Sequence, residues 1–213
     1  MEKRIAVVNF DMIMCNVIRV YQPLVDIKGY PGECWNRIHK ELKLRPMVDL
    51  RYDSNILQFL NKFLLKTVKN GAEIRCVDNI TECEDLFDLS NATTYNITNL
   101  GFFSGLKRDT DATILDKYNI GNWAYYLITN GKVKLDDYGW VKCINSDVSD
   151  YLYTRSAGKF FKTIATFKPK GKYDEVIFVF SPLFVPEEYR HIYELIIDSI
   201  EILTGKNCRG CNS

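Results

Sequence analysis

The sequence has 213 residues, and its 28 Lys and Arg nearly balance its 27 Asp and Glu. This balance excludes a global basic field for nucleic acid or an anionic membrane, and a hydrophobic share of 46% excludes a disordered chain. We therefore expect one folded domain over residues 1–205, followed by a C-terminal tail over residues 206–213.

The first half of the chain alternates short apolar strands with helical stretches. In chain order we expect a strand at Arg4–Phe10, helical stretches at Met12–Tyr21 and Trp35–Leu44, a helix from Ser54 to Asn70, a strand at Glu73–Val77 and a short helix opened by a Thr81–Glu84 capping box. The helix from Ser54 is the clearest, because its apolar residues share one face and Asn70-Gly71 is a helix stop signal.

The second half continues the alternation. We expect a strand at Thr93–Ile97, a helix at Ala124–Thr129, a strand at Tyr138–Ile144, an edge strand within Phe160–Phe167, a buried strand at Val176–Phe180 and a last helix from Pro186 to Leu203. The unbroken apolar run of Val176–Phe180 is typical of a parallel strand covered on both faces. Pro186 suits the first turn of a helix and Gly205 suits its end.

Strands that alternate with helices at this spacing predict a three-layer α/β fold, with a mainly parallel sheet and helices on both faces. Polar residues follow most of the predicted strands. Since the carboxyl ends of parallel strands meet at one edge, we expect a ligand site there. The candidate ligand-binding residues are Asp11, Asp78, Asn99, Asn122, Trp123, Asn145, Ser146 and Ser181.

Several of these residues have an alternative interpretation. Asp11 and Asp78 are placed either to bind a cation or a ligand, or to cap the helices that follow them. Asn122 either faces the ligand or caps the next helix, while Trp123 is buried. The two histidines, His39 and His191, lack metal-site spacing. A site for Mg²⁺ or Mn²⁺ would therefore use oxygen ligands from the acids.

The cysteines and the N-terminus indicate a cellular compartment. Seven cysteines are an odd number and favour reduced thiols over a disulfide framework. Cys208 and Cys211 form a C-x-x-C, for which a redox or structural-metal role is weighed against a frayed tail. The apolar run at the N-terminus is too short for a secretion signal or a membrane span, which predicts a cytoplasmic protein.

Several common enzyme motifs are absent from the sequence. It contains no Walker A loop, no G-x-G-x-x-G and no G-x-S-x-G. These absences argue against P-loop nucleotide hydrolysis, a Rossmann cofactor and an ordinary serine hydrolase.

Three segments, Gly121–Leu127, Tyr138–Ser146 and Tyr173–Pro186, carry a resemblance in their order and spacing. They read GNWAYYL, YGWVKCINS and YDEVIFVFSPLFVP. Together they resemble the peptide-arginase-like family of the arginase/deacetylase fold. The resemblance implies a three-layer α/β protein that binds two Mn²⁺ ions and hydrolyses the guanidinium of peptide arginine, a C–N bond, with a metal-bridging water as nucleophile.

The sequence departs from that family where the metal ligands would lie. The corresponding segment, Tyr95–Phe102, contains neither histidine nor acid. Two dications need several anionic or imidazole ligands. Our first hypothesis is therefore a metal-free, arginase-like pseudoenzyme that binds a peptide or small ligand at the strand ends. The alternative is an active metal-dependent hydrolase whose single Mn²⁺ or Mg²⁺ is held by Asp11, Asp78 and either Asp109 or Asp111.

Overall fold

The computed structural model describes residues 2–14, 40, 43, 52–101, 105–106, 118–142, 161–169, 171–182 and 184–208. Most of the helical stretches expected at Met12–Tyr21 and Trp35–Leu44 lie outside these residues. So do His39, Phe102, Asp109, Asp111, Asn145, Ser146 and Cys211.

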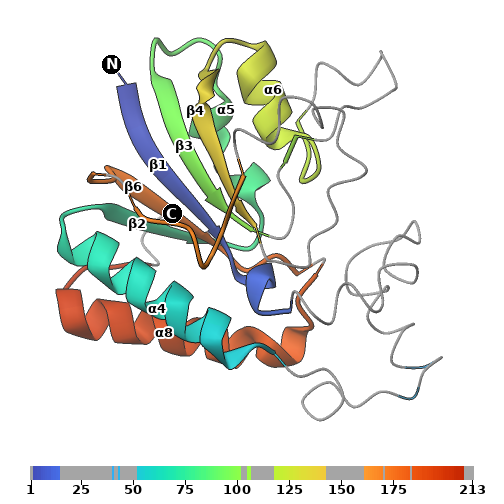
Figure 1. The fold of residues 1–213 in the computed structure, drawn as a ribbon, viewed down its shortest axis with the longest axis vertical. Coiled ribbons are helices and arrows are strands. Elements are labelled where there is room, and N and C mark those ends of the chain that lie inside the picture. Colours follow the sequence, from blue (N-terminus) through green and yellow to red (C-terminus); the bar gives the residue numbers. More distant parts are fainter. Residues whose placement is uncertain are drawn as a thin grey trace.

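Six parallel strands form one sheet in the order β2-β6-β1-β3-β4-β5 (Figure 1). The strands are β1 (Glu2–Asn9), β2 (Glu73–Val77), β3 (Thr94–Leu100), β4 (Val133–Lys142), β5 (Phe161–Thr163) and β6 (Glu175–Val179). The first strand in the sequence thus lies in the middle of the sheet, between the last strand and β3. β5 lies at the edge, as the sequence predicts.

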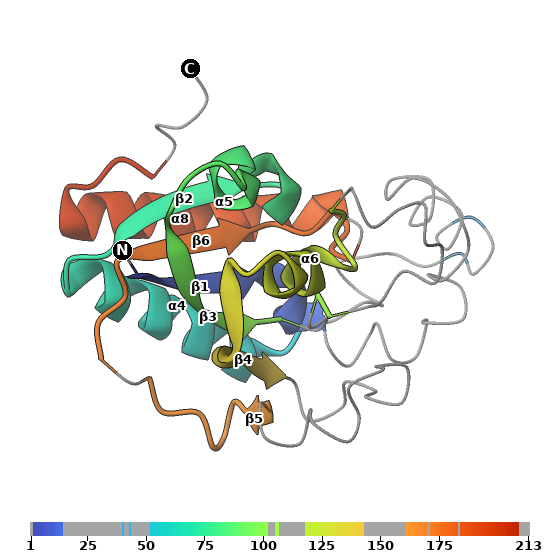
Figure 2. The same ribbon diagram turned by 90° about the horizontal axis from the view of Figure 1, so that it is seen from above.

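Helices cover both faces of this sheet, as Figures 1 and 2 show. The helices are α4 (Ser54–Lys69), α5 (Glu84–Phe87), α6 (Trp123–Thr129) and α8 (Arg190–Thr204), with short 3-10 turns η1 (Phe10–Met14), η2 (Ile80–Glu82) and η3 (Glu187–Tyr189). α4 and α8 pack side by side on one face, and α5 and α6 lie on the other. The three-layer α/β fold with a parallel sheet is confirmed.

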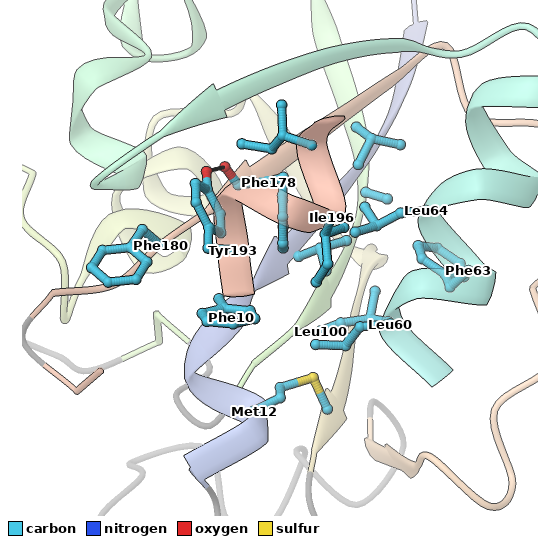
Figure 3. Close-up of a cluster of buried hydrophobic side chains, with 14 of the residues drawn as sticks. Phe10, Met12, Leu60, Phe63, Leu64, Leu100, Phe178, Phe180, Tyr193 and Ile196 are labelled. Atoms are coloured by element: carbon cyan, nitrogen blue, oxygen red, sulfur yellow. Dashed lines mark hydrogen bonds between the residues drawn. The ribbon is translucent and has the colours of Figure 1, made fainter. Parts of the chain in front are cut away.

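The central strands contribute side chains to two hydrophobic cores, one on each face of the sheet. Successive side chains point to opposite faces of a strand, so Val176 and Phe178 of β6 enter the core beneath α4 and α8, while Ile177 and Val179 enter the core beneath α5 and α6. All five residues of β6 are buried, as the apolar run predicts. In the first core, shown in Figure 3, Tyr193 of α8 donates a 2.8 Å hydrogen bond to the carbonyl of Phe178.

Helix ends follow the sequence signals with small corrections. Asp53, not Ser54, caps α4: its Oδ1 accepts hydrogen bonds from the backbone N–H of Asn55 and Ile56. The helix ends at Lys69, before the Asn70-Gly71 signal, and α8 ends at Gly205 in the left-handed conformation (φ 68°).

The short capping box lies two residues earlier than predicted. It joins Asn79 to Glu82 at the start of η2, and Glu82 accepts a 2.8 Å hydrogen bond from the Asn79 backbone N–H. The predicted box pairs Thr81 with Glu84, so the structure uses a different cap residue and a different acid.

Two strand boundaries differ from the prediction. β3 runs to Leu100, so Thr98 and Asn99 belong to the strand instead of following it. β4 begins at Val133, five residues before Tyr138, and carries an irregular register against β3 between Tyr95 and Ile97. The end of β3 is polar and the start of β4 carries exposed charges, so the pattern of apolar residues does not reveal these two boundaries.

The amino end of the sheet holds a buried ionic group. Glu175, at the start of β6, is 3% exposed and lies 2.7 Å from Lys3 of β1. Arg75 of β2 bonds both Glu175 and Asp85. Although burial opposes the charge of Lys3, the bond to Glu175 raises the pKa of Lys3.

The start of the C-terminal tail is docked, not frayed. Cys208 is 1% exposed, and its backbone N–H donates a 2.8 Å hydrogen bond to Glu201 of α8. Lys206 donates to the carbonyl of Ala72. The cysteines in the described ranges, Cys76, Cys83 and Cys208, form no disulfide with one another. Within those ranges, no helix is both long and apolar enough to cross a bilayer.

Candidate functional site

The connections of the sheet place a topological switch point between the carboxyl ends of β1 and β3. These strands are parallel neighbours, with Val7 beside Asn99 and Val8 beside Leu100. After β1 the chain reaches α4 on one face, and after β3 it reaches α6 on the other (Figure 2). In open α/β sheets such a topological switch point is where ligands bind.

An amide pair bridges the two strands at this point. Asn9, the last residue of β1, donates from Nδ2 to Asn99 Oδ1 at 2.9 Å and to the carbonyl of Leu100 at 3.2 Å. Asn99 is fully buried and donates from Nδ2 to the hydroxyl of Tyr138 at 3.1 Å. Asn99 therefore positions Asn9 from within the sheet and does not itself reach a ligand.

Gly101 and Trp140 complete the carboxyl end of β3. A Cβ atom on Gly101 would lie 2.5 Å from Asn9 Nδ2, so only glycine allows this close approach of the amide. The indole of Trp140 donates a 2.8 Å hydrogen bond to the Gly101 carbonyl. Residues 95–101, which contain no metal-ligating histidine or acid, are thus held at their carboxyl end by hydrogen bonds between neutral groups.

The turn before α6 lies beside this network. Asn122 is 4% exposed and stands at the N-cap position, but its Oδ1 accepts from the backbone N–H of Asn119 at 2.6 Å. Trp123 is buried, packs on Gly105 and contacts Tyr138 edge to face at 6.2 Å. Trp123 and Asn99 are therefore joined through Tyr138, whereas Asn122 shapes its own turn.

Asp78 and Ser181 come together elsewhere, at the ends of β2 and β6. The Asp78 carboxylate accepts two hydrogen bonds from Arg190, at 2.8 and 3.0 Å, and the guanidinium lies 4.0 Å from the centroid of the Phe180 ring. Burial opposes the charge of Arg190, but its bonds to Asp78 and Glu187 outweigh this and raise its pKa. The Asp78 carboxylate is thus paired with a guanidinium of its own chain.

Ser181 has a left-handed backbone with φ 61°, which is uncommon for a residue other than glycine. Its N–H donates to the carbonyl of Asp78 at 3.0 Å, and its own carbonyl accepts from Phe184 and Val185. These bonds turn the chain sharply from β6 into the last helix. Ser181 is therefore a buried turn residue in the structure.

The acids expected at the strand ends do not gather into a metal site in the described residues. Asp11 lies inside η1 and is 3% exposed, so it is not an open strand-end residue. Across the described part of the chain, no three His, Cys, Asp or Glu side chains stand close enough to hold a metal ion together. Asn145, Ser146, Asp109 and Asp111 lie outside it.

Sequence reasoning missed Asn9. The amide interrupts an otherwise apolar strand, and this interruption is the signal in the sequence, two residues before Asp11. Because Asn9 uses both amide hydrogens, its Oδ1 remains as an acceptor that no donor from the described residues meets.

Fold and site together define a three-layer, parallel α/β protein with a neutral amide network at its topological switch point. The chain matches no protein-family model, no curated protein and no solved structure. The function is therefore argued from geometry.

Proposed function

We propose that this chain binds a peptide or small ligand at the switch point between the carboxyl ends of β1 and β3, as an arginase-like protein that does not use a two-metal centre. The observation that carries the proposal is the Asn9–Asn99 bridge at the switch point. The bridge fixes Asn9 and leaves its Oδ1 to accept a hydrogen bond from an N–H group of the ligand.

The chemistry of the network favours this function over metal-dependent hydrolysis. Asn9, Asn99 and the Gly101 carbonyl are neutral, whereas a pair of dications needs anionic or imidazole ligands. Asp78 already forms a bidentate pair with Arg190. A neutral acceptor beside buried aromatic side chains suits the amide or guanidinium N–H groups of a peptide.

Chemical-shift mapping by NMR tests the binding site. The ¹⁵N-labelled full chain is titrated with N-acetyl-alanyl-arginyl-alanine amide, whose termini are neutral. We expect the amide signals of Leu100 and Gly101 to shift, and Asn9→Ala to weaken binding about tenfold, the loss of about 1.4 kcal/mol expected for one hydrogen bond. Asn61→Ala, on the exposed side of α4, is the matched control.

The same sample tests the alternative. Mn²⁺ is added to protein first treated with chelator, and the melting temperature and the release of urea are measured. A rise in melting temperature that Asp11→Asn abolishes, together with conversion of the peptide arginine to ornithine, would replace the metal-free proposal by the hydrolase. Shifts confined to residues far from β1 and β3 would reject the switch point as the binding site.

A further inference from the structure

Two cysteines that are far apart in the sequence meet at one edge of the sheet. β2 is an edge strand (Figure 1), and its side chains alternate between the two faces, so Ile74 and Cys76 pack against the core beneath α4 and α8. Cys208, in the tail after α8, is buried in the same core. The thiols of Cys76 and Cys208 share a hydrogen bond. The fold thus brings two thiol groups into contact.

Hydrogen bonds hold the tail in this position. The backbone N–H of Cys208 donates to Glu201 of α8 at 2.8 Å, and Lys206 donates to the carbonyl of Ala72, the residue before β2. The Cys208 thiol donates to the Lys206 carbonyl at 3.9 Å. Because a thiol carries a single hydrogen, Cys76 is the donor between the two thiols. The tail is therefore tied to α8 and to the start of β2 without a covalent bond.

A hollow of about 300 Å³ gives small molecules access to this pair. It lies between β2 and α8, and Cys76 lines it together with Tyr193 and Ile197. Cys76 is partly exposed, whereas Cys208 is 1% exposed. A small oxidant therefore reaches Cys76 first, and Cys208 is the second thiol in contact with it.

The surroundings of Cys76 keep its thiol protonated at neutral pH. The hydrogen bond with Cys208, burial and the nearby carboxylates of Glu194 and Glu201 raise the pKa of Cys76. The thiolate is the reactive form of cysteine, so Cys76 reacts slowly with an oxidant. A disulfide carries no charge, so burial and the two acids slow its formation but do not oppose the product.

We propose that Cys76 and Cys208 are a site of reversible oxidation, at which a peroxide joins them in a disulfide that fastens the C-terminal tail to β2. The Cys76 sulfur attacks one oxygen of hydrogen peroxide, the O–O bond breaks, one water leaves and Cys76 becomes a sulfenic acid. The Cys208 sulfur then attacks the Cys76 sulfur, the S–O bond breaks and a second water leaves. Two thiols and one peroxide thus give one disulfide and two waters.

The geometry gives Cys208 a partner other than Cys211, its neighbour in the C-x-x-C. A disulfide needs its two sulfur atoms about 2.05 Å apart, and those of Cys76 and Cys208 are already in contact. Residues 205–208 form neither helix nor strand. The remaining approach of the two sulfur atoms therefore does not require a helix or a strand to move.

Peptide mapping on the full chain tests this pairing. The reduced chain is treated in dilute solution with hydrogen peroxide, its remaining thiols are blocked with N-ethylmaleimide in denaturant, and it is cut with trypsin without reduction. Trypsin separates the three cysteines concerned: residues 76–107 carry Cys76, residues 207–209 carry Cys208 and residues 210–213 carry Cys211. We expect peptide 207–209 to be linked to peptide 76–107 in a chain that runs as a monomer on a non-reducing gel.

Three results would overturn the proposal. They are a link from peptide 207–209 to peptide 210–213, the absence of any link to peptide 76–107 after prolonged oxidation, and a link found only in disulfide-bonded dimers. Dithiothreitol added to the native oxidised chain should remove the link, as a reversible site requires.

A matched pair of variants assigns the cysteine within peptide 76–107. This peptide also contains Cys83, which is buried in the core on the opposite face of the sheet. Cys76→Ala should abolish the linked peptide, whereas Cys83→Ala should keep it. The reverse outcome would contradict the pairing. If Cys76→Ala unfolds, fragmentation of the linked peptide from the unchanged chain decides, because Cys76 is its first residue and Cys83 its eighth.

Thermal denaturation shows whether the bond fits the folded chain. A disulfide between positions 76 and 208 restricts the unfolded state, so the oxidised chain should melt at least about 4 °C above the reduced chain. Cys76→Ala treated with the same peroxide should show no such rise. A lower melting temperature of the oxidised chain would mean that the bond forms only by distorting the fold, which contradicts a preformed pair.

Discussion

At the amino end of the sheet, Glu175 lies buried between Lys3 and Arg75, whereas at the carboxyl end of β1 and β3 two asparagines join the strands without any charge. A buried ion is tolerated only while its partners remain, since an unpaired charge in the interior is costly. A neutral amide pair carries no charge that must be desolvated, so its burial needs no ionic partner. The amino end thus joins its strands through buried charges, and the carboxyl end joins β1 and β3 through a fixed, uncharged network.

Breaking the ionic group should have the largest effect. We expect Glu175→Gln to lower the free energy of unfolding by about 3–5 kcal/mol, because Lys3 and Arg75 would lose their shared buried partner. Urea denaturation measures this loss. Glu73→Gln is the matched control. Glu73 lies on β2 directly beside Glu175 of β6, but its side chain is exposed. Similar values for both variants would remove the contrast between the two ends.

Breaking the amide pair should cost less. Asn99→Leu removes the acceptor of one amide hydrogen of Asn9 and the donor to the hydroxyl of Tyr138, and we expect a loss of about 1–3 kcal/mol. The double variant Asn9→Leu/Asn99→Leu should be less destabilised than the sum of the single variants, because both members of one pair are replaced. Additive losses would show that the two amides do not act as a pair.

A smaller perturbation tests the close approach of Asn9 to the backbone. Gly101→Ala should cost about 1–2 kcal/mol, because the new Cβ would lie 2.5 Å from Asn9 Nδ2 and the amide must shift. Asn9→Ala in the same chain should restore most of the lost stability, as measured by thermal denaturation. If the double variant is no better than Gly101→Ala alone, the strain lies elsewhere.

The smallest effect concerns the exposed part of the ionic group. The hydrogen bond from Arg75 lowers the pKa of Asp85, whose side chain is 63% exposed. A lowered carboxylate pKa stabilises the fold above the unfolded pKa of about 4, and this contribution is lost as the pH falls further. The loss of stability between about pH 5 and pH 3 should therefore be shallower in Asp85→Asn than in the unchanged chain. An unaltered profile would mean that Asp85 adds nothing to the group.

The sequence was most informative where structure is local. α4, α8 and β6 follow from periodicity, caps and an apolar run, because a helix face or a strand covered on both faces leaves its pattern in consecutive residues. The end of β3 was not predictable in this way. Thr98 and Asn99 look like loop residues, and only their partners on β1 and β4 make them part of a strand.

The candidate site shows the same division. A polar cluster at the carboxyl ends of the strands was predictable from where polar residues follow apolar runs. The pairing within that cluster was not, since Asn9 and Asn99 are 90 residues apart and Asp78 and Arg190 are 112 residues apart. The order of the strands in the sheet determines which of these distant residues meet, and local patterns in a single sequence do not reveal that order.

The strand order has a consequence for how the protein is made. β6 lies between β2 and β1, so β2 has no neighbour in the sheet until residues 175–179 have left the ribosome. Nascent chains that stop before this point can pair β1 with β3 but leave β2 and the apolar face of α4 uncovered. Domains dominated by such distant contacts fold slowly, and completion of this sheet awaits the synthesis of β6.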